Sequence, residues 1–156
     1  MFALRLVRLI EDHADQLAEG LTRKLKASQA CAALLSSVPA SELKQRAYEI
    51  YRNLTDWLLS KTESEIEERY IGLGARRAQQ RVPYSEMLYA LHATKEHLWE
   101  FLRQEDLLQP TDLIGEIDLL YSMERFFDRA AYFASVGYEN VRSREIAHVP
   151  ASHPVG

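Results

Sequence analysis

The sequence contains few of the residues that cross-link a chain or interrupt helices. Its 156 residues include one cysteine, six glycines and five prolines. A single cysteine excludes an internal disulfide, which suits a reducing compartment. Cys31 lies in the apolar stretch A-C-A-A-L-L, with no His or Lys close by in sequence to activate its thiol. We therefore expect Cys31 to be a small buried side chain without a catalytic role.

Long apolar runs and a large excess of one charge are also missing. No stretch approaches the roughly 18 apolar residues of a membrane span. Arg5 and Arg8 interrupt the apolar N-terminus, which argues against a secretory signal. The formal net charge is -4, and basic residues alternate with acidic ones instead of clustering as phosphate binding requires. These features predict a cytoplasmic protein that binds neither membranes nor nucleic acid.

The sequence has no motif for catalysis or metal binding. Gly-x-Ser-x-Gly, a phosphate-binding glycine loop and Glu-x-x-His are all absent, and Gly72-Leu-Gly74 lacks the third glycine of a dinucleotide loop. A structural zinc would need four closely placed Cys or His ligands, and no such cluster exists. We predict no enzymatic activity, no metal and no cofactor.

What the sequence does contain is apolar residues spaced by three and four, which is typical of amphipathic helices. No segment alternates between apolar and polar residues as a strand would. The spacing predicts helices over about 2–28, 39–61, 62–81, 84–106 and from 111 to 138 or beyond, with a short helix or ordered loop over 29–37. These helices indicate one all-α domain over residues 1–146, followed by a flexible tail over 147–156. The domain is either globin-like, with five to six helices, or an antiparallel bundle of four or five helices. The two architectures differ in helix crossing angle, about 50° against about 20°.

Local signals refine the helix boundaries. Thr62-Glu-Ser-Glu65 is a capping-box pattern that opens the third long helix. Gly72 and Gly74 each cost about 1 kcal/mol against alanine inside a helix, so they indicate close helix approach or a local kink. Val82-Pro83 predicts a corner, Leu107–Pro110 a linker, and Gly137 a possible bend in the last helix.

The last helix carries apolar residues on more than one side. Its predicted inner face comprises Leu113, Ile117, Leu120, Phe127, Ala131, Ala134 and Tyr138. The pairs Phe126-Phe127 and Tyr132-Phe133 cover additional directions around the helix. Because one side would face the core and another could face a second subunit, we expect a homodimer.

Arg77 is the residue with the sharpest functional interpretation. It continues the stripe of Tyr70 on the third long helix, so its stem is expected to point inward. A buried guanidinium needs an acidic partner, for which Glu124 and Asp128 on the last helix are candidates, or a bound anion. Alternatively, the stem covers apolar surface while the charge reaches water.

His92 is placed near the inner stripe of the fourth long helix. It follows Leu91, whereas His97 lies five residues further on, a poor spacing for two ligands on one helix face. His92 is interpreted as a partly buried, hydrogen-bonded side chain, with a lone haem ligand as the alternative. The residues expected to form a pocket or switch are Tyr70, Arg77, His92 and Asp128.

The stretch Y-I-G-L-G-A-R-R-A-Q-Q-R-V-P-Y-S-E-M-L-Y-A-L, from Tyr70 to Leu91, is similar in layout to bacterial sensor globins. In those proteins a helix carrying Gly-x-x-His ends near a Val-Pro corner, and the His holds the haem iron. Here Arg77 stands three residues after Gly74, and a guanidinium has no lone pair for iron.

Two further patterns, L-I-E-D-H-A-D-Q-L-A and R-F-F-D-R-A-A-Y-F-A-S-V-G-Y-E, complete a resemblance to the N-terminal sensor domains of RsbR-type stressosome co-antagonists, specifically the RsbRD-like branch. The resemblance implies a bacterial stress-response signalling domain that is globin-like, dimeric and free of haem. Such domains normally precede an output module, and this chain contains none. It would therefore act alone, with a signalling partner or as a detached module, and a small ligand could tune it.

Overall fold

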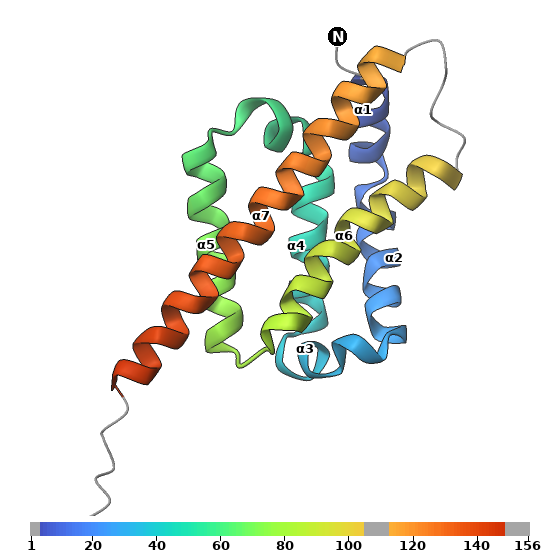
Figure 1. The fold of residues 1–156 in the computed structure, drawn as a ribbon. Coiled ribbons are helices and arrows are strands. Elements are labelled where there is room, and N and C mark those ends of the chain that lie inside the picture. Colours follow the sequence, from blue (N-terminus) through green and yellow to red (C-terminus); the bar gives the residue numbers. More distant parts are fainter. Residues whose placement is uncertain (1–3, 105–112, 149–156) are drawn as a thin grey trace, which may run out of the picture.

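The computed structural model describes residues 4–104 and 113–148, and within these ranges the chain forms helices and no strands. The helices are α1 (Leu4–Asp12), α2 (Ala14–Ala27), the 3-10 helix η1 (Gln29–Cys31), α3 (Ala32–Ser37), α4 (Ala40–Arg52), the π-helix η2 (Asp56–Ser60), α5 (Glu63–Gln79), α6 (Tyr84–Gln104) and α7 (Leu113–His148). The predicted all-α class is confirmed. Figure 1 shows α7 running obliquely across the molecule, crossing α5 on the left of the view, while α2 lies on the right.

The first predicted helix is divided in two at His13. The His13 N–H is shared between the carbonyl oxygens of Leu9 (3.2 Å) and Ile10 (3.1 Å). Its Nδ1 also lies 2.8 Å from the Leu9 oxygen. The turn between α1 and α2 contains neither glycine nor proline. The spacing of apolar residues continues across it, which is why the sequence predicts one helix here.

The segment after α2 agrees with the expected short helix, since η1 and α3 together occupy residues 29–37. The next predicted helix, 39–61, begins with Pro39 as the N-cap of α4. It is interrupted at Asn53 and continues into η2, which closes with a bond of 2.7 Å from the Lys61 N–H to the Asp56 oxygen. Glu11 of α1 accepts bonds from the Thr55 N–H and hydroxyl, each 3.1 Å, and so ties this irregular region to α1.

Helix α5 opens with the predicted capping box. The Glu65 N–H donates to the Thr62 hydroxyl (3.2 Å) and the Thr62 N–H donates to the Glu65 carboxylate (2.9 Å). The corner at Val82-Pro83 separates α5 from α6 as expected.

Glycines bring α5 and α7 into close contact. A Cβ on Gly74 would collide with the Ala134 carbonyl, and one on Gly137 would collide with the Ile71 carbonyl. The α5–α7 pair is the most extensive helix contact in the described structure. The predicted close approach at Gly74 is confirmed, but Gly72 has nothing near it. The predicted bend at Gly137 is wrong, because α7 continues through this residue and the missing side chain instead admits the α5 backbone.

The ends of the last two helices lie at the limits of the described residues. Helix α6 is described to Gln104, so the predicted helix end at 106, the linker at 107–110 and the helix start at 111 lie outside the described residues. Helix α7 extends to His148, two residues into the expected tail, and residues 149–156 also lie outside.

The core contains one apolar cluster, to which every helix of the described part contributes, including the short helices η1, α3 and η2. Within this cluster, the Trp57 ring lies 5.9 Å from the Tyr70 ring and 5.5 Å from the Phe126 ring, measured between centroids. Cys31 is buried, as expected.

The inner face of α7 was predicted well, with one error. Phe127 and Ala134 are buried, and Leu120, Ala131 and Tyr138 pack partly buried against the core. Ile117, however, is 53 % exposed, so its assignment to the inner face is wrong. The side chain of Leu113 lies outside the described part.

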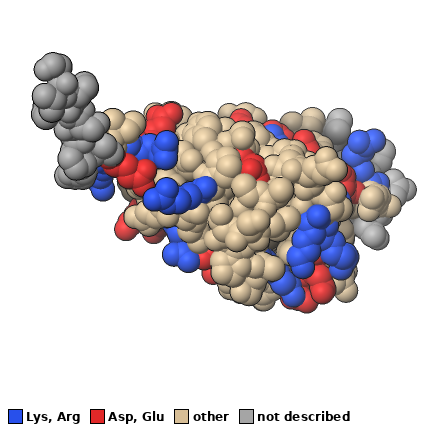
Figure 2. All heavy atoms as spheres, turned by 90° about the horizontal axis from the view of Figure 1, so that it is seen from below, with Lys and Arg blue, Asp and Glu red and all other residues tan. Residues whose placement is uncertain are grey.

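Figure 2 shows the face seen from below in the view of Figure 1, where small basic and acidic groups surround a broad area that carries neither charge. No extended surface of one sign is visible on this face. Within residues 4–104 and 113–148, no helix combines the length and apolarity needed to cross a membrane.

Candidate functional site

The interior contains a cavity of about 60 Å³ between α2, α4, α5 and α6. Its walls are mainly apolar side chains, including Leu25, Leu43, Leu73, Met87 and Leu91. Four charged side chains also line it, Arg46, Glu49, Arg69 and Arg77, all from the facing helices α4 and α5. The cavity therefore combines an apolar interior with a wall rich in guanidinium groups.

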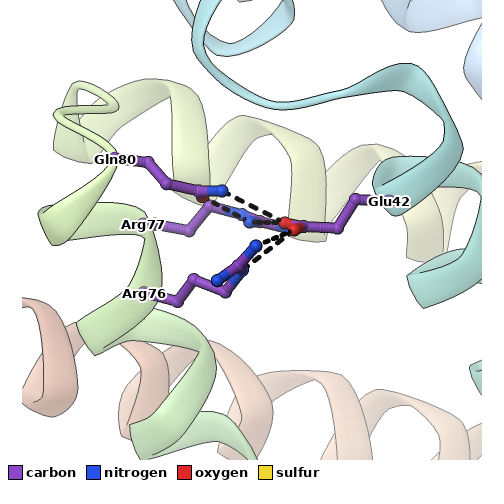
Figure 3. Close-up of polar contacts among 4 residues, drawn as sticks. All are labelled: Glu42, Arg76, Arg77 and Gln80. Atoms are coloured by element: carbon purple, nitrogen blue, oxygen red, sulfur yellow. Dashed lines mark hydrogen bonds and ion pairs between the residues drawn. The ribbon is translucent and has the colours of Figure 1, made fainter.

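Arg77 reaches this cavity from α5 and is bound by side chains on both helices (Figure 3). Its Nη1 donates to one oxygen of the Glu42 carboxylate and to the side-chain oxygen of Gln80, the latter at 2.7 Å. Arg76 donates to the other Glu42 oxygen, with its Nε at 2.9 Å. One carboxylate on α4 thus holds two guanidiniums on α5.

The three bonding residues keep the pKa of the Glu42 carboxyl low. Hydrogen bonds from Arg76, followed by those from Arg77 and its charge, lower this pKa from 4.5 to about 2, although burial opposes the shift. The Arg77 side chain is 5 % exposed, and burial lowers its pKa while Glu42 raises it. The cluster carries a net positive charge, because two guanidiniums share one carboxylate.

The predicted inward orientation of Arg77 is confirmed, but its predicted partners are wrong. Glu124 instead accepts bonds from Lys95 (3.0 Å) and the Trp99 indole (2.7 Å), both on α6. Asp128 is exposed on α7. The reason is that α5 uses its glycine side to contact α7, whereas Arg77 lies on the side that faces α4.

A second ion pair joins the same two helices further along. Arg69 of α5 donates to the Glu49 carboxylate of α4. Arg46 lies between Glu42 and Glu49 on α4 and is half-buried. Burial is the main cause of its lowered pKa, followed by the nearby charges of Arg69 and Arg77. Within the described residues, Arg46 has no hydrogen-bonding or ion-pair partner.

The four residues expected to form a pocket or switch do not come together. Tyr70 and Arg77 line the cavity. His92 is exposed on α6, so its expected partial burial is wrong. Asp128 lies on the outer side of α7, in a groove with Tyr132.

The sequence interpretation missed the contribution of α4. Glu42, Arg46 and Glu49 recur at intervals of four and three, so they share one helix face beside the apolar stripe. That spacing predicts a row of charged side chains along one edge of the buried face of α4. It does not reveal which helix lies opposite.

The cavity does not suit haem. Sites for ligands of drug size occupy roughly 300–1,000 Å³, several times the volume present here. No histidine lines the cavity, and the position that resembles a haem-binding His holds Arg77. Within the described residues, no group of three or more His, Cys, Asp or Glu side chains is arranged to hold a metal ion.

Comparison with protein families gives one match, which covers nearly the whole chain. Residues 5–149 match the family described as RsbT co-antagonist protein rsbRD N-terminal domain. No curated protein and no solved structure gives a significant match.

Proposed function

The chain belongs to the family of rsbRD N-terminal domains of RsbT co-antagonist proteins, a family of stress-response signalling regulators, and from this we propose that it is a homodimeric, non-enzymatic sensor domain. In this proposal it binds no haem and transmits a signal through contacts with a partner of the RsbT type. The family match is the observation that carries the signalling role. The exposed side of α7 supports dimerisation.

Helix α7 presents aromatic and aliphatic side chains to solvent. Tyr121 is 64 % exposed and Tyr132 is 65 % exposed. They are eleven residues apart, three helical turns, so they lie on nearly the same side of α7. Ile117, one turn before Tyr121, is also exposed. Large apolar side chains repeated along one exposed helix face are typical of a surface that packs against a protein.

The same surface carries charges of both signs. Arg125 and Asp128 lie between the two tyrosines, and a groove of about 590 Å³ next to them is bounded by Glu63 and Glu67 of α5. A twofold symmetric contact places the same patch on both subunits. Because each copy offers acidic and basic groups together with tyrosines, two copies of this patch can pair with one another.

Light scattering on the purified chain tests dimerisation. One chain has a mass of 18.0 kDa, and we expect about twice this mass at micromolar concentration. The double variant Tyr121→Glu/Tyr132→Glu should give a single-chain mass, since four like charges would be buried at a symmetric interface. Tyr89→Glu, at an exposed tyrosine on α6, is the control away from α7 and should remain dimeric. A monomeric unmodified chain, or a dimer unaffected by the double variant, would contradict the proposed α7 interface.

The partner proposal is tested by binding to an RsbT-type protein. Titration of the purified partner into the unmodified chain should give saturable binding with a fixed stoichiometry. Repeating it with the monomeric variant asks whether dimerisation is needed. If the unmodified dimer gives no binding, the proposed signalling contact does not reside in this domain.

A further inference from the structure

The facing sides of α4 and α5 are joined by ion pairs at two places, and Arg46 lies between them on α4. On α4, Glu42, Arg46 and Glu49 occupy one face at successive turns. On α5, the two arginines at 76 and 77 bind the first of these acids, and Arg69 binds the last. The middle position, Arg46, has no acidic partner within the described residues.

The residues of α5 between the two ion pairs explain why Arg46 is unpaired. They include Tyr70 and Leu73, both buried and both lining the cavity. Neither provides a negative charge. Glu42 and Glu49 contribute attraction at a distance, but their carboxylates are hydrogen-bonded to the guanidiniums of α5.

The local charge contrasts with that of the whole protein. Around the cavity wall, the four guanidiniums of residues 46, 69, 76 and 77 accompany the two carboxylates of Glu42 and Glu49, a net charge of +2. The complete chain has a formal net charge of -4. An anion would therefore find in this cavity a positive site in an otherwise acidic molecule.

We propose that the cavity binds a small monocarboxylate, whose carboxylate pairs with Arg46 while its short alkyl group occupies the apolar space beside Leu73 and Met87. A guanidinium presents its N–H donors in a planar fork that matches the two oxygens of a carboxylate. The apolar walls favour an organic acid over an inorganic anion of the same charge. The volume of about 60 Å³ limits the ligand to a few non-hydrogen atoms, such as propionate.

This inference rests on the proposed sensor function, and it supplies that function with a ligand class. The backbones of α4 and α5 approach each other at few positions, and the charged side chains described above bridge the two helices. A carboxylate bound to Arg46 of α4, with its alkyl group beside Leu73 of α5, would add a further link between them. Since α5 packs closely on α7, a ligand that binds one α4–α5 spacing more tightly than another would also bias the position of α7.

Calorimetric titration of the intact purified chain with sodium propionate, at ionic strength held constant with sodium chloride, tests the proposal. We expect saturable binding with one site per chain. Arg46→Gln should weaken the affinity by roughly tenfold or more, because it removes a charged hydrogen-bond donor. Arg46→Lys, which keeps the charge but loses the planar fork, should bind with intermediate affinity. Arg52→Gln, the same change at an exposed position on α4, is the matched control and should bind as the unmodified chain does.

The length of the acid provides a second measurement. Acetate, propionate and butyrate should bind, whereas octanoate should bind more weakly than propionate because it exceeds the cavity. Absence of propionate binding by the folded chain, equal affinity for propionate and nitrate, or equal weakening by the changes at 46 and 52 would each overturn the proposal.

Light scattering on the same samples tests dimerisation independently, so failure of the ligand site can be distinguished from failure of the proposed function. A dimer that binds no carboxylate would remove the ligand and leave the dimeric signalling domain intact. A monomer that binds propionate through Arg46 would support the ligand site and contradict the dimer.

Discussion

Removing the Glu42 carboxylate while keeping its shape is the most informative single change to the α4–α5 connection. Glu42→Gln leaves the Arg77 guanidinium, which is almost fully buried, with no negative charge in hydrogen-bonding distance. Breaking a buried pair by removing one partner costs about 3–5 kcal/mol, since an uncompensated charge remains in the interior. Arg76 is about half exposed, and its share of the loss is small because water screens it.

The depressed pKa of Glu42 gives an independent magnitude. A shift from 4.5 to about 2 corresponds to at most about 3.4 kcal/mol at 1.36 kcal/mol per pKa unit. Part of that shift comes from the exposed Arg76, so we expect a loss of about 2 kcal/mol on substitution. In a domain of this size, that loss lowers the midpoint of thermal unfolding by about 4–8 °C. Because the folded pKa is lowered, the stabilisation is present above pH 4.5 and is lost as the pH falls from there toward 2.

Urea unfolding followed by tryptophan fluorescence measures this loss. Glu68→Gln, an exposed acid on α5, is the matched control and should change the free energy of unfolding by less than about 0.5 kcal/mol. The double variant Glu42→Gln/Arg77→Leu should recover part of the loss, since it also removes the unpaired charge. If Glu42→Gln is as stable as the control at pH 7, the electrostatic argument for this cluster is refuted.

Two further predictions concern helix packing and haem. Gly74→Ala should destabilise the fold by more than about 2 kcal/mol in urea unfolding, because its Cβ collides with the α7 backbone. Gly72→Ala should instead stabilise by about 0.5–1 kcal/mol, and equal effects at both positions would contradict the described α5–α7 contact. Haemin added to the purified chain should produce no stoichiometric Soret band, and a band that disappears in His92→Ala would overturn the non-haem proposal.

The features that the sequence predicted correctly depend on contacts within a few residues. The capping box at Thr62 and the inward side of α5 follow from spacing along one helix, since residues three and four apart share a face. Burial of Arg77 follows from the same rule. The close approach at Gly74 was predictable because glycine in a helix interior is unfavourable unless a neighbour needs the space.

The features that were wrong or missed depend on which helices become neighbours. Periodicity places Arg77 on the inner side of α5, but that side has one edge toward α7 and another toward α4. At Gly74 and Gly137 the backbones of α5 and α7 are in direct contact, so the edge toward α7 has no room for an ion pair. The carboxylate that binds Arg77 therefore comes from Glu42 on α4, thirty-five residues earlier. The turn at His13 was missed because no residue there is a strong helix breaker, and its apolar pattern continues on both sides.

The ion pair of Arg77 and the small size of the cavity have a common physical origin. An imidazole at this position could stay neutral in an apolar pocket and offer a nitrogen lone pair, as a haem ligand must. A guanidinium stays charged, so its burial requires a carboxylate nearby. Glu42 meets that requirement from α4, and the two side chains with Gln80 fill the interior where α4 and α5 face each other. A haem would have to displace this hydrogen-bonded cluster and leave Arg77 without its counter-ion. The remaining space holds only a small molecule, and the unpaired Arg46 on its wall makes a small anion the species best suited to it.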